Sequence, residues 1–239
     1  LKDIARKKSI DLELIFAKNV IRKGVKKKNI DFVINRSRNY NISILFELNN
    51  IKVFNNSKVT LLGNNKLSGY NLAKSLEIDF PEIYLRWKDR QYIEKPNNKH
   101  GGRDIKIITN QNNKPLNNKI KQKYFNDLIG DIRFYIIGNQ IIHSVIRTND
   151  NSSIFNFTKG GSVRLYDYSK KETRIVKKFL NNNYFDYVGI DFFLTKDKKL
   201  IFNEIEDVVG SRMLSHLKIN NTTNLLINQI IKKIKKSKK

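Results

Sequence analysis

The chain has 239 residues, a formal net charge of +25 and no cysteine. Its length is enough for one large domain or two small ones with independent cores. The lack of cysteine excludes disulfide bonds, cysteine nucleophiles and zinc sites built on thiolates. No run of about 18 apolar residues occurs, and the first residues contain no apolar segment of the signal-peptide type. We therefore expect a globular cytoplasmic protein without a membrane span.

The large positive charge has two competing explanations. A strongly basic chain is typical of proteins that bind nucleic acids or other polyanions. The lysines are, however, spread over every segment, and only residues 232–239 form a dense basic block. The chain is also crowded with Lys, Asn and Ile and nearly lacks Ala, Pro and Trp, a bias that an AT-rich genome produces. Nucleic-acid binding is therefore the less favoured alternative.

The first 58 residues alternate between helical and extended patterns. Helices are expected at residues 1–5, 17–28 and 39–50, and strands at residues 9–16, 31–36 and 51–55. In the third helix Ile42, Leu45 and Leu48 are expected on one face. Strands alternating with helices predict a parallel sheet, and no G-x-G-x-x-G indicates a dinucleotide site. No strand precedes Leu1, which is compatible with a fragment of a longer protein.

A helical pattern follows at residues 63–77, and Lys66 lies at its start. Lys95 ends a short strand and precedes a loop with Gly101 and Gly102 between two strands. Adjacent glycines allow backbone N–H groups to approach a phosphate closely, and a lysine adds the opposite charge. The same glycines also suit an ordinary hairpin turn, so the residues alone leave both interpretations open.

A hairpin is predicted around the Gly-Asn dipeptide at 138–139, a combination typical of tight turns between strands. Asp131 and Arg133 lie two residues apart on its first strand and therefore share one face. His143 and Arg147 lie on the returning strand. A single histidine on a mostly apolar strand is more often a structural residue than a catalyst. A helix is then expected at residues 169–182.

Three acids occur in a second predicted hairpin at residues 184–206. Asp191 lies in its first strand, and Glu204 and Glu206 lie on one face of its second strand. If Asp191 points to that face, three carboxylates converge, which like charges tolerate only with a cation or a raised pKa. Oxygen ligands of this kind suit Mg²⁺ or Mn²⁺. The alternative is that these acids are simply solvated at the end of a strand.

Taken in order, these motifs resemble the ATP-grasp fold. The motifs are Lys66, EKP before the Gly101-Gly102 loop, GDIR at 130–133, Arg147, FNFTKGG at 155–161, GIDFF at 189–193 and NEIE at 203–206. The resemblance spans about residues 59–212. It indicates the branch of ribosomal-protein-modification (RimK-like) and glutathione-synthetase-like carboxylate–amine ligases.

The resemblance implies an α+β fold in which two subdomains sandwich the nucleotide. Within an ATP-grasp domain at 59–239, about residues 92–125 would form the small nucleotide-covering subdomain and about residues 126–239 the metal-binding one. Residues 1–58 resemble the small α/β domain that precedes this fold, with its first strand missing.

The resemblance also implies roles for individual residues. Lys66 and Lys95 would contact the nucleotide phosphates, under a loop containing Gly101 and Gly102. The remaining nucleotide-binding residues would be Gln122, Lys123, Tyr124 and Phe125 at the adenine hinge, together with Asp131, Arg133 and Asn156. Asp191, Glu204 and Glu206 would hold the metal. Arg147 or Arg212 would steady the oxyanion formed during catalysis.

The implied reaction joins a carboxylate to an amine through an acyl phosphate, with ATP and with Mg²⁺ or Mn²⁺ as cofactors. The substrates would be small molecules or peptides whose identity no motif encodes, and an assembly of identical chains is compatible with the sequence. Three positions depart from the family pattern. Glu206 stands where Asn is usual, Lys123 lies near the usual acid of the hinge, and Ile154 replaces an arginine. These departures are compatible with one or two metal ions. They are also compatible with an alternative function, a nucleotide-binding protein of this fold without ligase activity.

Overall fold

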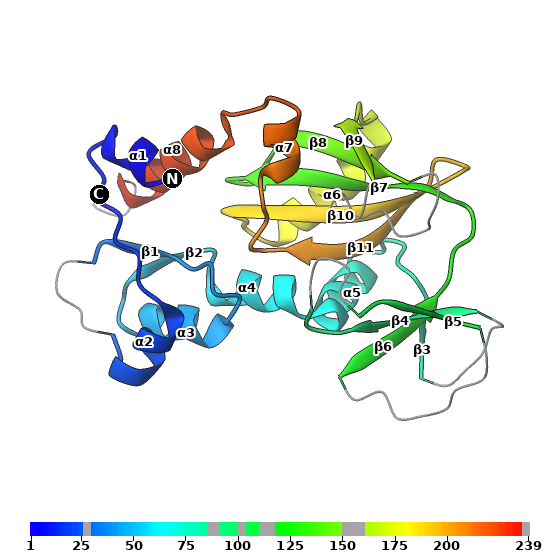
Figure 1. The fold of residues 1–239 in the computed structure, drawn as a ribbon, viewed down its shortest axis with the longest axis horizontal. Coiled ribbons are helices and arrows are strands. Elements are labelled where there is room, and N and C mark those ends of the chain that lie inside the picture. Colours follow the sequence, from blue (N-terminus) through cyan, green and yellow to red (C-terminus); the bar gives the residue numbers. More distant parts are fainter. Residues whose placement is uncertain (26–29, 86–90, 100–103, 110–117, 150–160, 236–239) are drawn as a thin grey trace.

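The computed structural model describes residues 1–25, 30–85, 91–99, 104–109, 118–149 and 161–235. These residues form three sheets that follow one another along the chain (Figure 1). A two-stranded sheet lies near the N-terminus, a four-stranded sheet follows, and a five-stranded sheet contains the predicted acids. The expected mixture of helices and sheets is therefore confirmed.

The N-terminal part is built on two parallel strands, β1 (Phe32–Ile34) and β2 (Lys52–Phe54). Parallel neighbours need a crossover connection, which α3 (Tyr40–Leu48) supplies, with α2 (Ala17–Lys23) packed beside it. The core here consists of Val20, Ile42, Phe46, Ile51 and Val53.

Two expectations for this part are wrong. Residues 9–16 form no strand, and Leu14 and Phe16 are 71% and 62% exposed. In the described chain no neighbouring strand pairs with these apolar residues, and a strand exists only where it has such a partner. In α3 the buried face contains Ile42 and Phe46, whereas Leu48 is 76% exposed.

Two short helices lead from this part to the rest of the chain: α4 (Ser57–Asn64) and α5 (Lys66–Ser75). The side chain of Asn56 accepts a hydrogen bond from the backbone N–H of Val59, and Asn65 caps α5 in the same way. The cap at Asn65 makes Lys66 the first residue of α5, as the sequence predicts.

The four-stranded sheet is antiparallel and has the order β3-β6-β4-β5. Its strands are β3 (Ile83–Tyr84), β4 (Tyr92–Pro96), β5 (Lys106–Ile108) and β6 (Lys119–Lys123). Lys95 lies near the end of β4, where the sequence places it.

The five-stranded sheet is also antiparallel, in the order β11-β10-β7-β8-β9. Its strands are β7 (Leu128–Ile137), β8 (Gln140–Thr148), β9 (Ser162–Leu165), β10 (Tyr187–Thr195) and β11 (Leu200–Glu206). The hairpins predicted around residues 138–139 and 196–199 are both present. α4 and α5 contact β11, the edge strand.

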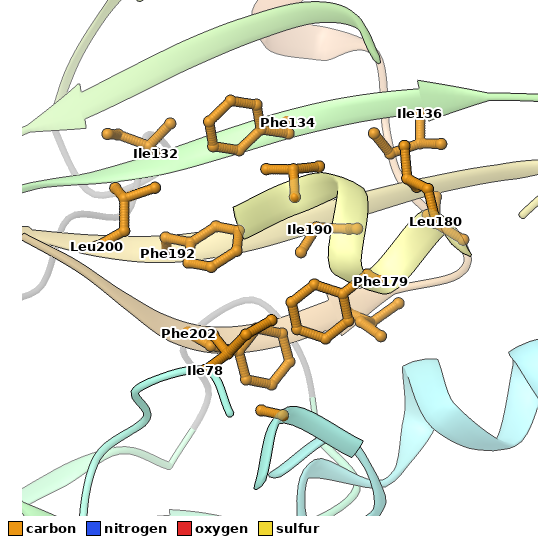
Figure 2. Packing of buried hydrophobic residues seen from close by; sticks show 14 of the residues in the cluster. Ile78, Ile132, Phe134, Ile136, Phe179, Leu180, Ile190, Phe192, Leu200 and Phe202 are labelled. Carbon is orange, nitrogen blue, oxygen red and sulfur yellow. The ribbon is translucent and has the colours of Figure 1, made fainter. Parts of the chain in front are cut away.

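One face of this sheet packs against α6 (Lys170–Asn182), whose N-terminus carries a capping box between Ser169 and Glu172. Figure 2 shows the apolar side chains at this contact. The rings of Phe179, Phe192 and Phe202 lie 4.9–6.2 Å apart between centroids. Residues 132, 134 and 136 of β7 alternate into the same core.

The opposite face of the sheet is divided in two. One half is apolar and lies in a cluster with α7 (Arg212–His216) and α8 (Thr222–Lys235), while α1 (Lys2–Arg6) contacts α8 (Figure 1). The other half carries charged side chains. In the described part of the chain, no helix is both long and apolar enough to cross a membrane.

Asn55 joins the N-terminal part to the five-stranded sheet. Its amide nitrogen donates to the carbonyl oxygens of Tyr187 (2.7 Å) and Asp207 (3.1 Å). Its amide oxygen accepts from the backbone N–H groups of Asp186 and Tyr187 at 3.1 and 2.9 Å. Asn55 is 5% exposed, so one side chain satisfies four backbone groups in a buried contact.

We expect Asn55→Ala to lower the free energy of unfolding by about 2–4 kcal/mol, because it leaves buried backbone groups without partners. Urea denaturation measures the change. Asn182→Ala is the control, since Asn182 is exposed and makes one hydrogen bond within α6, to the carbonyl of Lys178. A similar loss in both variants would contradict the role given to Asn55.

Candidate active site

The charged half of the sheet brings together acids and bases from four neighbouring strands. Asp191 on β10 lies opposite Arg133 on β7 and opposite Glu204 on β11. Asp131 lies opposite Arg147 on β8. Because directly opposed residues share a face, these side chains lie on the same side of the sheet. The prediction that Asp191 shares a face with Glu204 is therefore confirmed.

Asp191 is the most deeply buried member, at 1% exposure. Its Oδ1 accepts from Nε of Arg133 at 2.8 Å, and its Oδ2 accepts from Nη2 of Arg133 at 2.7 Å. Nη2 of Arg147 also donates to Oδ2, at 2.8 Å. Burial alone would raise the pKa of Asp191, but the two guanidinium groups outweigh it and hold the pKa below its usual value.

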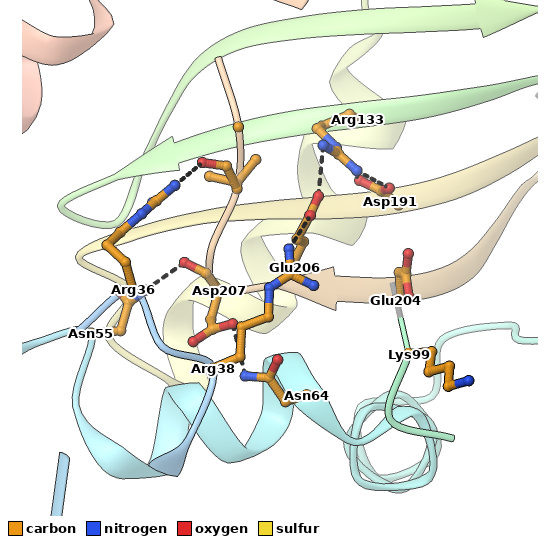
Figure 3. Close-up of polar contacts among 12 residues, drawn as sticks. Arg36, Arg38, Asn55, Asn64, Lys99, Arg133, Asp191, Glu204, Glu206 and Asp207 are labelled. Atoms are coloured by element: carbon orange, nitrogen blue, oxygen red, sulfur yellow. Dashed lines mark hydrogen bonds and ion pairs between the residues drawn. The ribbon is translucent and has the colours of Figure 1, made fainter. Parts of the chain in front are cut away.

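Arg133 connects Asp191 to Glu206. Its Nη1 lies 2.7 Å from Oε2 of Glu206, while its other two nitrogens bind Asp191 (Figure 3). Burial would lower the pKa of Arg133, but the charges of Asp191 and Glu206 raise it. The expectation that the three acids face one another across a shared gap is therefore wrong, because an arginine lies between two of them.

Arg147 forms a second ion pair, with 2.6 Å between its Nη2 and Oδ2 of Asp131. Burial raises the pKa of Asp131 to about 6 although Arg147 opposes this. Within the residues that the structure describes, two buried atoms of the pair, Oδ1 of Asp131 and Nε of Arg147, have no hydrogen-bond partner.

The two predicted phosphate-binding lysines also reach this face. Nζ of Lys66 lies 3.2 Å from Oε2 of Glu204. Nζ of Lys95 donates to Oδ1 of Asn203 at 3.0 Å. The β-bulge between Asp191/Phe192 and β11 leaves Asn203 as an extra residue, which explains its contact with the neighbouring sheet.

Lys95 is 3% exposed. Burial lowers the pKa of Lys95 to about 7, with the nearby charge of Glu204 opposing and that of Lys66 assisting the decrease. Within the described residues Lys95 has no ion pair with a carboxylate. It is therefore a buried ammonium group suited to receive an anion.

The predicted adenine hinge, Gln122 to Phe125, begins within the last two residues of β6. The side chain of Gln122 is buried and accepts from the hydroxyl of Tyr70 at 3.1 Å. Lys123 lies over the ring of Phe125, with 5.6 Å between Nζ and the ring centroid. Phe125 packs against Phe193 on the charged side of the sheet. The role of these residues and of Tyr124 in binding the nucleotide stays a prediction.

The structure does not assemble every predicted residue at this face. Arg212 is exposed at the start of α7, and no contact joins it to the charged residues of the described chain. Gly101, Gly102 and Asn156 lie outside the described residues. His143 is half-buried opposite Tyr135, and its Nε2 lies 3.3 Å from Oδ1 of Asn221.

The N-terminal part contributes two arginines that no sequence pattern indicates. Nη2 of Arg38 lies 3.4 Å from Oε1 of Glu206, and Nη2 of Arg36 donates to the carbonyl of Val209 at 3.2 Å (Figure 3). Both arginines follow β1 and are separated from β11 by about 170 positions, so no local pattern indicates the contact.

Asp207 follows β11 and packs against α4. It is 3% exposed, its Oδ1 accepts from the amide of Asn64 at 2.9 Å, and its Oδ2 has no hydrogen-bond partner within the described residues. Burial raises the pKa of Asp207 to about 6, although the hydrogen bond from Asn64 opposes this. The side chain of Asp207 packs closely against Gly63. A Cβ atom at position 63 would lie 2.7 Å from Cβ of Asp207, so only glycine leaves enough space.

The fit of a divalent metal is mixed. Carboxylate oxygens are the donors that Mg²⁺ prefers, and Asp191 and Glu204 oppose each other on one face. In the described residues, however, no three acidic, histidine or cysteine side chains form a group that could hold a metal ion. The donor chemistry fits, and a metal would have to share Asp191 with its arginines.

The chain is similar to known proteins both in sequence and in fold. Residues 102–230 match the family model of the RimK-like ATP-grasp domain. An uncharacterized protein of Mycoplasma genitalium, MG011, is 30% identical over 97% of this chain and 85% of its own length. Its homolog in Mycoplasma pneumoniae is 27% identical over 80% of this chain and 70% of its own.

Solved structures show the same fold at low identity. A RimK domain ATP-grasp protein from Sphaerobacter thermophilus superposes with a TM-score of 0.73 at 9% identity, covering 95% of this chain and 92% of that one. D-cycloserine synthetase DcsG gives 0.71 at 12% identity over 97% and 92%. The D-alanine–D-alanine ligase of Bacillus anthracis complexed with ATP gives 0.67 at 13% identity over 95% and 87%. The ATP-grasp fold is therefore confirmed.

We expect Arg133→Gln to cost about 3–5 kcal/mol of unfolding free energy, because Asp191 would stay buried without its principal cation. Chemical denaturation at pH 7 measures this. The matched control is Arg174→Gln on the outer face of α6, where the side chain is exposed and a change within about 0.5 kcal/mol is expected. Equal stability of both variants would show that the buried pair contributes nothing.

Asp207→Asn tests the raised pKa of Asp207. A raised folded-state pKa means that the native state holds a proton that the unfolded state releases, so stability falls as the pH rises from about 4 to 7. With a folded pKa of about 6, the loss between pH 4 and pH 7 in wild type relative to Asp207→Asn is about 2 kcal/mol. Urea denaturation at pH 4 and pH 7 measures the difference. Asp11→Asn, at an exposed acid, is the control; a constant difference between wild type and Asp207→Asn would contradict the raised pKa.

Proposed function

Because the chain belongs to the RimK-like ATP-grasp family, we propose that it is an ATP-dependent carboxylate–amine ligase that forms an amide or peptide bond in the cytoplasm. The observation that carries this proposal is the position of Lys95. In the described part of the chain, this buried ammonium group has an amide but no carboxylate as partner, and it feels the charge of Lys66 at the edge of the charged face. Such a pair of cations suits the phosphates of a nucleotide.

The proposed reaction has two steps. A substrate carboxylate oxygen attacks the γ-phosphorus of ATP and releases ADP, which gives an acyl phosphate. An amine then attacks the acyl carbon, releases phosphate and loses a proton, which gives the amide. No side-chain nucleophile is needed, in agreement with a chain that lacks cysteine.

Lys66 and Lys95 would bind the phosphates and offset the charge that builds up during phosphoryl transfer. Placing phosphates beside Lys95 would restore its full positive charge, because nearby anions raise the pKa of an ammonium group. Arg147 is the side chain that we propose for the tetrahedral oxyanion. Its Nε has no hydrogen-bond partner among the described residues, and the ion pairs with Asp131 and Asp191 hold its guanidinium group in place.

Asp191 and Glu204 are the acids that we propose to hold Mg²⁺, with Mn²⁺ as a substitute. Bound there, the metal would neutralise phosphate charge. The hinge residues from Gln122 to Phe125 would contact the adenine, and Asp131 and Arg133 would lie next to the nucleotide. Gly101, Gly102 and Asn156 stay part of this proposal through the family resemblance alone, as does Arg212 as a second oxyanion-binding residue. The substrates would be small-molecule or peptide carboxylates and amines.

A second candidate is a nucleotide-binding protein of the same fold without ligase activity. The specific observation in its favour is that arginines hold both oxygens of Asp191, so a metal has to compete for them. ADP release separates the two candidates. A ligase releases ADP in response to a carboxylate and an amine, whereas the alternative binds ATP and stays inactive over a broad panel of amino acids.

We expect saturating Mg-ATP to stabilise the protein by about 2.7 kcal/mol at one hundred times the dissociation constant. Thermal melting with and without Mg-ATP detects this as an upward shift. Lys95→Met should abolish the shift, because it removes the buried cation that receives the phosphates. Lys74→Met, at an exposed lysine on α5, should keep it. No shift in the wild-type protein would contradict nucleotide binding.

A further inference from the structure

The loop at residues 35–39 is built to hold its two arginines in place. Oδ1 of Asn35 accepts from the backbone N–H and the hydroxyl of Ser37, at 2.9 and 2.6 Å. The amide nitrogen of Asn35 donates to the carbonyl of Asn39 and the hydroxyl of Ser43, at 3.0 and 2.8 Å. Arg38 has a φ of 64°, a left-handed conformation that a non-glycine residue adopts only where the surroundings fix it.

This loop meets the charged face at Glu206. Oε2 of Glu206 lies 2.7 Å from Nη1 of Arg133, and Oε1 lies 3.4 Å from Nη2 of Arg38. The two guanidinium groups come from opposite sides, one from β7 within the sheet and one from the N-terminal part. Each carboxylate oxygen of Glu206 therefore already has a cation of its own.

From this geometry we propose that Glu206 is a positioning residue and not a metal ligand. It holds Arg133 against Asp191 and fastens the 35–39 loop to the charged face through Arg38. The proposal rests on the proposed function, since it concerns which acids of that site receive the metal. Of the two glutamates on β11, it leaves Glu204, which pairs with Lys66, as the one that receives the metal.

The partners of the two glutamates support this division. Glu204 contacts Lys66, a residue that we propose to turn toward phosphates when the nucleotide binds. Glu206 contacts two arginines, whose guanidinium groups stay charged at every pH of interest. Its side chain is 14% exposed, so losing both arginines would leave a carboxylate largely shielded from water.

Manganese binding separates the two roles. The probe is Mn²⁺ with saturating ADP, followed by electron paramagnetic resonance, on wild type, Glu206→Gln and Glu204→Gln. We expect Glu204→Gln to raise the Mn²⁺ dissociation constant at least about tenfold more than Glu206→Gln does, because even the outer-shell partners of a metal site change its affinity by about ten- to a hundredfold. An equal or larger loss in Glu206→Gln would overturn the proposal.

The side chain of Arg38 supplies a second, spectroscopic readout. Its Nε–H signal in ¹⁵N NMR is assigned by its disappearance in Arg38→Gln. We expect this signal to move to the position of exposed arginines in Glu206→Gln and to stay unchanged in Glu204→Gln. A signal that is insensitive to Glu206→Gln would show that Glu206 does not position Arg38.

Arg38→Gln keeps the test decisive if Glu206→Gln does not fold. Glu206 then keeps Arg133 as partner, so we expect the Mn²⁺ affinity to stay as in wild type. Tighter Mn²⁺ binding in Arg38→Gln would show that the arginine withholds a metal ligand, and would overturn the proposal. If wild type itself fails to bind Mn²⁺ with ADP, the proposed function fails, while the NMR test of positioning still stands by itself.

Discussion

The structure depends on charge compensation at the buried carboxylate of Asp191. An isolated carboxylate at this depth would be strongly unfavourable, and two arginines on adjacent strands make it tolerable. Their guanidinium groups extend the pairing to Asp131 on one side and Glu206 on the other. Charges that would separately oppose folding thus hold each other in one layer on the sheet, while the aromatic core behind the sheet excludes water.

Such a network of buried ion pairs adds little to the stability of the fold but can serve function. Buried ion pairs are weak contributors to stability compared with well-packed apolar residues, so their presence indicates a role other than holding the fold. In the described chain, Arg147 has a nitrogen without a hydrogen-bond partner, and Lys95 donates to the amide of Asn203 and lies over the ring of Tyr70, so both have capacity for an added group. A site of this kind is preorganised, because the side chains are already oriented before a charged ligand arrives.

The N-terminal part contributes side chains to the charged face of the five-stranded sheet. Asn55 fixes it to β10 through four backbone groups, and the 35–39 loop then delivers Arg36 and Arg38 to the end of β11. The fold is shared with structures of 9–13% identity, so the backbone arrangement tolerates nearly complete replacement of side chains. We expect proteins of this fold to differ in loop contacts such as those of Arg36 and Arg38, because function resides in the sites that a fold carries and not in the fold itself.

The sequence by itself determined much of this protein. Periodicity and turn residues located the two hairpins, the strand position of Lys95 and the start of α5 at Lys66, because these depend on local backbone preferences. The alternation of side chains also placed Asp131 with Arg133, and Glu204 with Glu206. Only the tertiary structure decided that Arg133 lies between Asp191 and Glu206 and that Arg38 reaches Glu206. Those pairings join residues up to 168 positions apart, and which distant charges meet depends on how the sheets pack. The strand expected at residues 9–16 failed for the same reason, since a strand exists only beside a partner that the local sequence does not specify.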